Sequence, residues 1–342
     1  METQNVTCTV IVGGFFGDEG KGKIASYLAV SDKVAAMVRA GCGTNAGHTV
    51  VYNGKKFKLR QIPCGFVNEK TKLYMSAGVL VDPEVILKEI DDTNTKERLK
   101  IDFQTGIIEP QHRERDTGTA ISKIIGTTGS GSGPCNVDRA SRVSKIAKDI
   151  PELAEYLCDV ALEVNELIDA QENVVLEGTQ GTFISLYHGT YPYVTSKDVC
   201  ASAICSDVGI GPTKVDDVLV IFKSYVTRVG EGPLEGELSE EETIKRGWQE
   251  KGTVTGRTRR ASPFNYKLAK RAVYLNGATQ CAITKFDVVF PDTKGIKTFE
   301  ELPRQAVGFI REVEAQLKIP VTLIGTGPGV EEIIDRRSDL SC

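Results

Sequence analysis

Short apolar runs alternate with amphipathic segments along the chain. The run at 7–14 is apolar and ends in glycines, which predicts a buried strand, and a helix is expected at 24–30 after a charged, glycine-rich turn. Further strands are expected at 34–39, 173–176, 217–225, 279–284 and 321–324. Apolar strands that alternate with helices predict an α/β fold with a mainly parallel central sheet flanked by helices on both faces.

Two other patterns predict local structure. Apolar residues recur at helical spacing over 153–167 and over 303–317, which predicts a helix in each segment. The runs 49–52 and 55–59 flank Asn53-Gly54, a pair that favours a tight hairpin turn. No repeat or linker divides the chain, so we expect residues 1–342 to form a single large α/β domain with loop and helical excursions.

The composition is that of an ordinary globular protein. Of its 342 residues, 40% are hydrophobic and 26% are charged, which allows a large buried core. The formal net charge of −4 gives no basic excess for DNA or RNA, so a nucleotide ligand is expected to be a small molecule in a local pocket. No apolar run reaches membrane-spanning length and no signal peptide is evident, so we expect a cytoplasmic protein without a membrane partner. Nine cysteines without a C-x-x-C pair indicate reduced thiols rather than disulfides or a zinc site.

The segment 13–23 has the composition of a phosphate-binding loop between the first predicted strand and helix. Backbone N–H groups, the helix N-terminus and Lys21 could all face one polyphosphate, as in a P-loop NTPase. The loop is a variant, because Gly22 follows Lys21 and offers no hydroxyl to a magnesium ion. Asp18 is the candidate ligand, since a hard carboxylate beside phosphates suits Mg²⁺. A glycine-rich turn with solvated charges is the alternative interpretation.

Other loops carry candidate binding residues. The turn 41–49 contains His48, and the segment 126–134 combines glycines with hydroxyls that suit a nucleotide monophosphate or a loop that orders on binding. The segment 176–182 ends a predicted strand at its carboxyl side, where ligands of parallel sheets usually bind. A lone loop histidine is usually unremarkable, and a disordered surface loop is the alternative interpretation of 126–134.

Two segments suggest which ligands are bound. The segment 253–260 places three arginines after a glycine. Guanidinium groups suit phosphates or the carboxylates of a dicarboxylic amino acid. A solvated basic turn is the alternative interpretation. After the strand at 279–284, Asp287 can accept both the N1–H and N2–H₂ donors of guanine, and Lys285 can cover the ring. Adenine lacks that donor pair, so this segment favours GTP over ATP.

In this order, the segments resemble the adenylosuccinate synthetase family. The loop 17–23 is similar to the family's GDEGKGK signature and the turn 45–49 to its N-A-G-H-T turn, and the blocks 176–182, 189–196 and 253–260 follow in the family's order. The resemblance extends from Val10 to about Ile334. The chain is shorter than the common form, mainly within 142–173 and 289–302, and resembles the compact form typical of archaea.

Three departures from the family pattern stand out. Phe15-Phe16 replaces the usual Gln-Trp, Thr258 interrupts the run of arginines, and Gly325 replaces the serine of the S-T-G-P turn near the guanine base. The last change implies that one side-chain hydrogen bond to GTP is missing.

The resemblance implies a GTP-dependent carbon–nitrogen ligase of purine biosynthesis. It would form adenylosuccinate from IMP and L-aspartate through a 6-phosphoryl-IMP intermediate, release GDP and phosphate, and catalyse the first committed step of AMP synthesis from IMP. The implied cofactor is Mg²⁺. The resemblance also implies a homodimer in which Arg142 reaches the IMP of the neighbouring subunit.

Residue roles follow by the same resemblance. The catalytic residues would be Asp18, which takes the N1 proton of IMP, and His48, which hydrogen-bonds the charge on O6; Asp18 and the Gly47 carbonyl would hold the metal. The GTP-binding residues would be Gly17, Asp18, Glu19, Gly20, Lys21, Gly22, Lys23, Arg259, Lys285, Phe286, Asp287, Gly325, Thr326 and Gly327. The IMP-binding residues would be Asp18, Lys21, Asn45, Ala46, Gly47, His48, Thr128, Arg142, Gln180, Thr195 and Arg257. The aspartate-binding residues would be Thr253, Val254, Thr255, Gly256, Arg257 and Arg259.

Two other functions remain compatible with the sequence. One is a related enzyme that aminates a guanine nucleotide, which substrate comparison of IMP with GMP and dGMP would distinguish. The other is a GTP-binding regulatory switch, although it would leave the arginines of 253–260 and the turn 45–48 without a role. The metal-ligand and base roles of Asp18 are also in tension, because metal binding lowers the basicity of a carboxylate.

Overall fold

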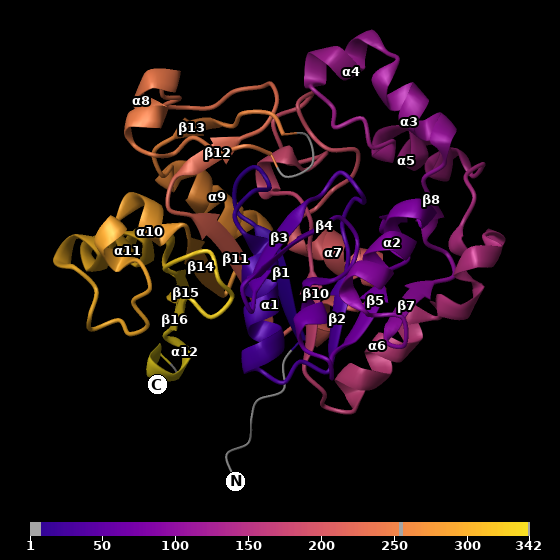
Figure 1. Cartoon of the computed structure of the whole chain (residues 1–342), viewed down its shortest axis with the longest axis horizontal. Coiled ribbons are helices and arrows are strands. Elements are labelled where there is room, and N and C mark those ends of the chain that lie inside the picture. Colours follow the sequence, from indigo (N-terminus) through magenta and orange to yellow (C-terminus); the bar gives the residue numbers. More distant parts are fainter. Residues whose placement is uncertain (1–7, 253–255, 341–342) are drawn as a thin grey trace.

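A computed structural model describes residues 8–252 and 256–340, in which a ten-stranded sheet forms the centre of the molecule (Figure 1). Neighbouring strands of this sheet are parallel except β15 and β16, which are antiparallel. The mainly parallel sheet expected from the sequence is therefore confirmed. In order across the sheet, the strands are β16 (Ile333–Asp335), β15 (Val321–Gly325), β14 (Gln280–Thr284), β11 (Asp217–Lys223), β1 (Cys8–Gly13), β10 (Val174–Glu177), β2 (Ala36–Arg39), β5 (Lys72–Met75), β7 (Leu99–Asp102) and β9 (Leu157–Cys158).

Helices cover both faces of the sheet because strand β1 is apolar on both sides. Val10 and Val12 pack in one core with residues of α6, α7, α9 and α11, whereas Ile11 packs in a second core with α1, α2 and the hairpin β3–β4. The α-helices are α1 (Lys21–Ser31), α2 (Pro83–Thr93), α3 (Pro110–Thr117), α4 (Ala120–Ile125), α5 (Ser132–Ser141), α6 (Val160–Asp169), α7 (Ala201–Val208), α8 (Glu240–Lys245), α9 (Tyr266–Asn276), α10 (Phe286–Val289), α11 (Arg304–Leu317) and α12 (Arg337–Leu340). None of the helices in the described part of the chain has the length and hydrophobicity needed to cross a bilayer.

Smaller elements lie around the sheet. They are the strand pairs β3 (His48–Tyr52) with β4 (Lys55–Leu59), β6 (Leu80–Val81) with β8 (Gly106–Ile107), and β12 (Val226–Arg228) with β13 (Arg260–Ser262). The 3₁₀ helices are η1 (Cys64–Val67), η2 (Ala147–Asp149), η3 (Pro151–Tyr156), η4 (Thr182–Ile184), η5 (Pro212–Lys214) and η6 (Pro291–Thr293). The predicted hairpin is confirmed, with Asn53 and Gly54 at φ 48° and 75°, the left-handed conformation that a two-residue hairpin turn requires.

One predicted helix is wrong in its extent. The segment 153–167 was expected to be a single helix, but it begins as η3, continues as the edge strand β9 and becomes helical only at Val160. Asp159 ends the strand and caps the helix, since its side chain accepts a 2.9 Å hydrogen bond from the Leu162 N–H. Leu153 and Val160 are still buried, so the apolar spacing reflects a shared core rather than one helix.

The parallel strands bring the loops of interest to one edge of the sheet. Strands β1, β2, β10, β11, β14 and β15 run in the same direction, so the loops after their carboxyl ends are neighbours. In Figure 1, α3, α4 and α5 group together at the upper right, and β12, β13 and α8 group at the upper left. The segment 303–317 is helical as predicted, as α11.

Candidate active site

The predicted phosphate loop lies between β1 and α1, and its shape depends on a buried carboxylate. Gly20 at the start of α1 has φ 86°, a left-handed conformation that favours glycine. Glu19 is fully buried, and its Oε1 accepts hydrogen bonds from the N–H groups of Phe15 at 2.9 Å and Gly17 at 2.8 Å. The Glu19 side chain therefore shapes the loop from inside, and only its backbone is available to a ligand.

The two lysines of the loop point inward. Lys21 Nζ lies 3.1 Å from Glu19 Oε2 and also donates to the carbonyls of Gly17 and Gln180. Lys23 Nζ donates to the carbonyls of Gly327 at 2.5 Å and Glu332 at 2.7 Å, and burial lowers the pKa of Lys23 to about 8. The lysines thus tie the loop to the ends of β10 and β15.

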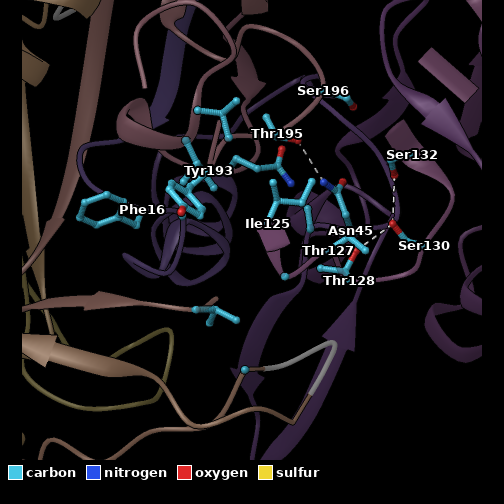
Figure 2. A pocket seen from close by; sticks show the side chains of 18 of the residues that line it. Phe16, Asn45, Ile125, Thr127, Thr128, Ser130, Ser132, Tyr193, Thr195 and Ser196 are labelled. Atoms are coloured by element: carbon cyan, nitrogen blue, oxygen red, sulfur yellow. Dashed lines mark hydrogen bonds between the residues drawn. The ribbon is translucent and has the colours of Figure 1, made fainter. Parts of the chain in front are cut away.

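A cavity of about 400 Å³ opens beside the phosphate loop, within the usual size range of small-molecule sites (Figure 2). Its walls come from loops that are far apart in sequence, including those after α4, β10 and β12. Of the residues implied by the resemblance, the cavity is lined by Gly17, Asp18, Asn45, Ala46, Gly47, His48, Thr128, Gln180, Thr195, Arg257 and Arg259. The fold thus brings together most residues predicted to bind IMP.

One wall of the cavity is rich in amide and hydroxyl groups. Asn45 donates from Nδ2 to Thr195 Oγ1 at 3.2 Å, while its Oδ1 is buried and has no hydrogen-bond partner among the described residues. Thr128, Ser130 and Ser132 form a chain of hydroxyls with contacts of 3.0 and 3.1 Å (Figure 2). A buried acceptor without a partner is costly, so the Asn45 amide is suited to a ligand's donor.

His48 enters the cavity from the start of β3, and a buried ion pair holds it. Its Nδ1 lies 2.5 Å from Glu177 Oε1 and 2.5 Å from Arg39 Nη1, and these two charged groups lie 2.6 Å apart. Burial, together with the positive charge of Arg39, lowers the pKa of His48 to about 4, so the imidazole is neutral at neutral pH. Burial alone would raise the pKa of Glu177, but contacts with Arg39 and His48 outweigh burial and lower that pKa to about 2.

Asp18 belongs to a second cluster of charged side chains. Its Oδ2 accepts a hydrogen bond from the Thr227 hydroxyl and lies 3.1 Å from Arg259 Nε and 3.7 Å from Lys223 Nζ. Arg259 Nη1 and Lys223 Nζ also donate to Glu250. Burial raises the pKa of Glu250, but Lys223, Lys285 and Arg259 outweigh it and hold that pKa well below its usual range.

The arginine segment contacts the loop across the cavity. Arg257 Nη2 donates to the carbonyls of Gly126 at 2.8 Å and Thr127 at 3.1 Å. Gly256 has φ 67° and does not line the cavity. The predicted aspartate-binding residues Thr253, Val254 and Thr255 lie outside the described residues.

The predicted guanine site is separate from this cavity. It lies at the ends of β14 and β15, next to the phosphate loop, because Thr284 Oγ1 donates to the Glu19 carbonyl at 2.6 Å. Asp287 Oδ1 is buried and has no hydrogen-bond partner within the described part of the chain. Phe286 is fully buried and packs against Phe290, so its side chain belongs to the core. The guanine-site residues outside the cavity lining are Lys285, Phe286, Asp287, Gly325, Thr326 and Gly327.

Arg142 is also away from the cavity. It ends helix α5 with φ 66° and is exposed, beside Val143, which is 72% exposed.

Sequence reasoning missed several residues that contact the predicted catalytic groups directly or through one neighbour. Arg39, Glu177 and Lys223 are charged residues at the carboxyl ends of apolar strands, which is a usable signal. Thr227 and Glu250 carry no such signal, because their contacts depend on how the segment after β11 folds back over Asp18.

A glycine-rich phosphate loop after a central parallel strand, beside a cavity that carries amide, hydroxyl and charged side chains, defines a nucleotide-binding α/β enzyme. The family model described as adenylosuccinate synthetase matches residues 10–152 and 143–291. The adenylosuccinate synthetase of Archaeoglobus fulgidus is 54% identical over 332 residues, covering 97% of this chain and 98% of the relative. That of Methanocaldococcus jannaschii is 53% identical over 339 residues, covering 98% of each chain. The chain therefore belongs to the adenylosuccinate synthetase family and is a ligase.

Solved structures agree with this assignment. Fully ligated adenylosuccinate synthetase from Plasmodium falciparum superimposes with a TM-score of 0.89 at 25% identity, covering 97% of this chain and 100% of that one. Succinoaminodeoxyadenylate synthetase of cyanophage S-2L, bound to dGMP and dATP, superimposes with a TM-score of 0.82 at 22% identity, covering 97% of this chain and 96% of that one. The second likeness establishes the shared fold alone. Family membership removes the regulatory-switch interpretation.

Proposed function

We propose that this ligase joins L-aspartate to the 6-position of IMP at the expense of GTP, and releases adenylosuccinate, GDP and phosphate. The observation that carries the proposal is that Asp18, His48, Arg257 and Arg259 line one cavity beside the phosphate loop. The 6-oxygen of IMP is a poor leaving group, so direct displacement by an amine would be slow. Transfer of the GTP γ-phosphoryl group to O6 makes it a good leaving group, and the aspartate amine then displaces phosphate.

In this mechanism Asp18 removes the N1 proton of IMP, which builds negative charge on O6. His48 donates a hydrogen bond to that charge. Nδ1 is occupied by Arg39 Nη1 and Glu177 Oε1, so Nε2 is the ring nitrogen left to face the substrate, and donation to O6 requires the single proton of the neutral imidazole on Nε2. We therefore assign the Nε2–H tautomer to His48.

The proposed Mg²⁺ site uses the Asp18 carboxylate and the Gly47 carbonyl. Both residues line the cavity, and carboxylate and carbonyl oxygens are the donors that Mg²⁺ prefers. When bound, the ion would neutralise charge on the transferring phosphoryl group. Gln180, Thr195 and Asn45 would orient the purine nucleotide from the amide and hydroxyl wall.

GTP is proposed to extend from the phosphate loop to the ends of β14 and β15. Asp287 Oδ1 is buried and has no hydrogen-bond partner among the described residues, so it is suited to the N–H donors of guanine. Lys285 directly follows strand β14. Because the side chains of Glu19 and Lys23 are turned inward, the loop would contact the phosphates mainly through backbone N–H groups.

Arg257 and Arg259 are proposed to bind the carboxylates of aspartate together with the segment 253–256. We further propose a cytoplasmic homodimer in which the exposed Arg142 enters the neighbouring subunit's site. The exposed apolar residues Val137 and Val143 on either side of the end of α5 support an interface there.

A substrate panel tests the choice of purine. Turnover is measured with IMP, GMP or dGMP as acceptor and with GTP or ATP as phosphoryl donor. We expect turnover with IMP and GTP, and a preference for dGMP would instead identify a relative that aminates guanine nucleotides.

Asp18→Ala should abolish turnover while GTP binding largely survives, and near-normal turnover would refute the role of Asp18.

A further inference from the structure

The contacts of Asp18 are concentrated on one of its two carboxylate oxygens. Within residues 8–252 and 256–340, the Thr227 hydroxyl, Lys223 Nζ and Arg259 Nε all approach Oδ2. No described residue makes a hydrogen bond or ion pair with Oδ1. The carboxylate is therefore held on one side and has its other oxygen available for the cavity that Asp18 lines.

The direction of the hydrogen bond from Thr227 is fixed by its neighbour. Lys223 Nζ lies 2.5 Å from Thr227 Oγ1, and an ammonium group can only donate. The hydroxyl oxygen of Thr227 therefore accepts from Lys223, and its single proton is left for Asp18 Oδ2. A threonine without this lysine could equally turn its proton elsewhere.

Lys223 is itself held in place. It is 1% exposed, donates to Glu250 Oε2 at 3.0 Å, and lies 4.6 Å from the centroid of the Tyr225 ring. Glu250 in turn accepts a hydrogen bond from the Tyr225 hydroxyl at 2.5 Å. The buried chain thus runs from Glu250 through Lys223 and Thr227 to Asp18.

Thr227 has no role in the binding scheme described above. It is 1% exposed on strand β12, where it pairs with Ala261 of β13, and it does not line the cavity. A buried threonine in a short strand could serve packing alone. Its hydroxyl, however, sits between a buried ammonium and the carboxylate of Asp18, where a methyl group would leave both charges without that contact.

We propose that Thr227 is a positioning residue for Asp18, and that the Lys223–Thr227 pair holds Oδ2 so that Oδ1 faces the substrate and metal. This inference rests on the proposed function, because it assigns a purpose to the orientation of Asp18. It also distinguishes the two oxygens of that carboxylate. Oδ2 is the anchored oxygen, and Oδ1 is the oxygen presented to the cavity.

The test compares variants that differ by the hydroxyl. Thr227→Val removes the hydroxyl and keeps the shape, while Thr227→Ser and Thr227→Ala form a second pair for the case that the valine variant does not fold. Thr71→Val is the matched control, since Thr71 is fully buried and its hydroxyl donates to the Val34 carbonyl at 2.8 Å, away from the site.

Two readouts are taken on the full-length enzyme. One is kcat and KM for IMP, GTP and aspartate, and the other is Mn²⁺ affinity in the presence of GDP, measured from the electron paramagnetic resonance signal of free Mn²⁺. Loss of a hydrogen bond to a charged group predicts that Thr227→Val and Thr227→Ala lower kcat and Mn²⁺ affinity by about 10- to 100-fold. KM for IMP and aspartate should stay unchanged, Thr227→Ser should restore both quantities, and Thr71→Val should change neither.

Wild-type values in Thr227→Val or Thr227→Ala would overturn the inference and leave the proposed function standing. A serine variant as impaired as the alanine variant would also overturn it, because the methyl group rather than the hydroxyl would then matter. A wild-type enzyme without turnover would refute the proposed function itself. The Mn²⁺ titration needs no turnover, so it would still support or overturn the role of Thr227.

Discussion

Arg39 Nη1 lies 2.5 Å from Nδ1 of His48, and the same guanidinium nitrogen lies 2.6 Å from Glu177 Oε1. All three side chains are buried, so the imidazole is fixed by a charge pair that solvent does not screen. The neutral state and tautomer proposed for His48 depend on this arrangement.

Replacing Glu177 with glutamine is expected to impair both stability and catalysis. The change leaves the buried Arg39 charge without its counter-ion, which should cost about 3–5 kcal/mol in the free energy of unfolding. It also frees the His48 ring, so kcat should fall by about 10- to 100-fold. Urea unfolding and steady-state kinetics measure the two effects. Glu163→Gln, at a residue that accepts a 2.8 Å hydrogen bond from Tyr74 outside the cavity, is the control for activity. Normal turnover in Glu177→Gln would contradict the positioning of His48.

Arg257 links the arginine segment to the loop after α4, and its fork is expected to be needed for aspartate. Arg257→Lys keeps the charge and loses the planar donor pair, so KM for aspartate should rise by about 10- to 100-fold. Steady-state kinetics at saturating IMP and GTP measure this effect. The exposed Arg271 on α9 provides the control, and Arg271→Lys should leave KM unchanged. An unchanged KM in Arg257→Lys would remove the residue from the aspartate site.

Asp287 is expected to determine affinity for GTP. Asp287→Asn replaces a carboxylate acceptor with an amide, and KM for GTP should rise by about 10- to 100-fold. KM for IMP should not change, because Asp287 lies outside the cavity. Asp292→Asn, at an exposed position after α10, is the control. An equal KM for GTP in the two variants would contradict the assignment of Asp287 to the guanine site.

Chelation should separate a catalytic metal from a structural one. The donor atoms of His48, Cys64 and Glu177 lie within 4.8 Å of one another, a grouping that can hold an ion. Arg39 already supplies a cation to this group, so we expect no metal there. EDTA should therefore abolish turnover, which Mg²⁺ restores, without changing the thermal unfolding midpoint of the unliganded enzyme. A lower midpoint after chelation, together with metal detected by elemental analysis, would contradict this expectation.

Much of the fold could be predicted because it depends on local pattern. The apolar run of β1 and the Asn53-Gly54 turn specify their structures through burial and backbone conformation, and both are confirmed. The segment 153–167 could not be resolved in the same way. Its apolar spacing fits a helix, whereas pairing of Leu157 and Cys158 with β7 at the sheet edge is a tertiary effect. The single-domain organisation stays a prediction.

The site residues also differ in how far local sequence pattern predicts them. Loops at strand ends, such as those with Asp18 and His48, are found by motif, and the structure gathers them around one cavity. Thr227 and Glu250 were not found, because a lone threonine or glutamate outside a motif has no distinguishing pattern. Their importance comes from contacts across long sequence separations, which the sequence does not display.

The most direct test of the central claim follows ultraviolet absorbance near the purine band in a mixture of enzyme, Mg²⁺, IMP, GTP and aspartate. Each component is omitted in turn, and ATP is substituted for GTP. We predict an absorbance change that requires all three substrates and Mg²⁺ and is lost with ATP. GTP hydrolysis without any change in the purine spectrum would contradict the claim that this enzyme makes adenylosuccinate.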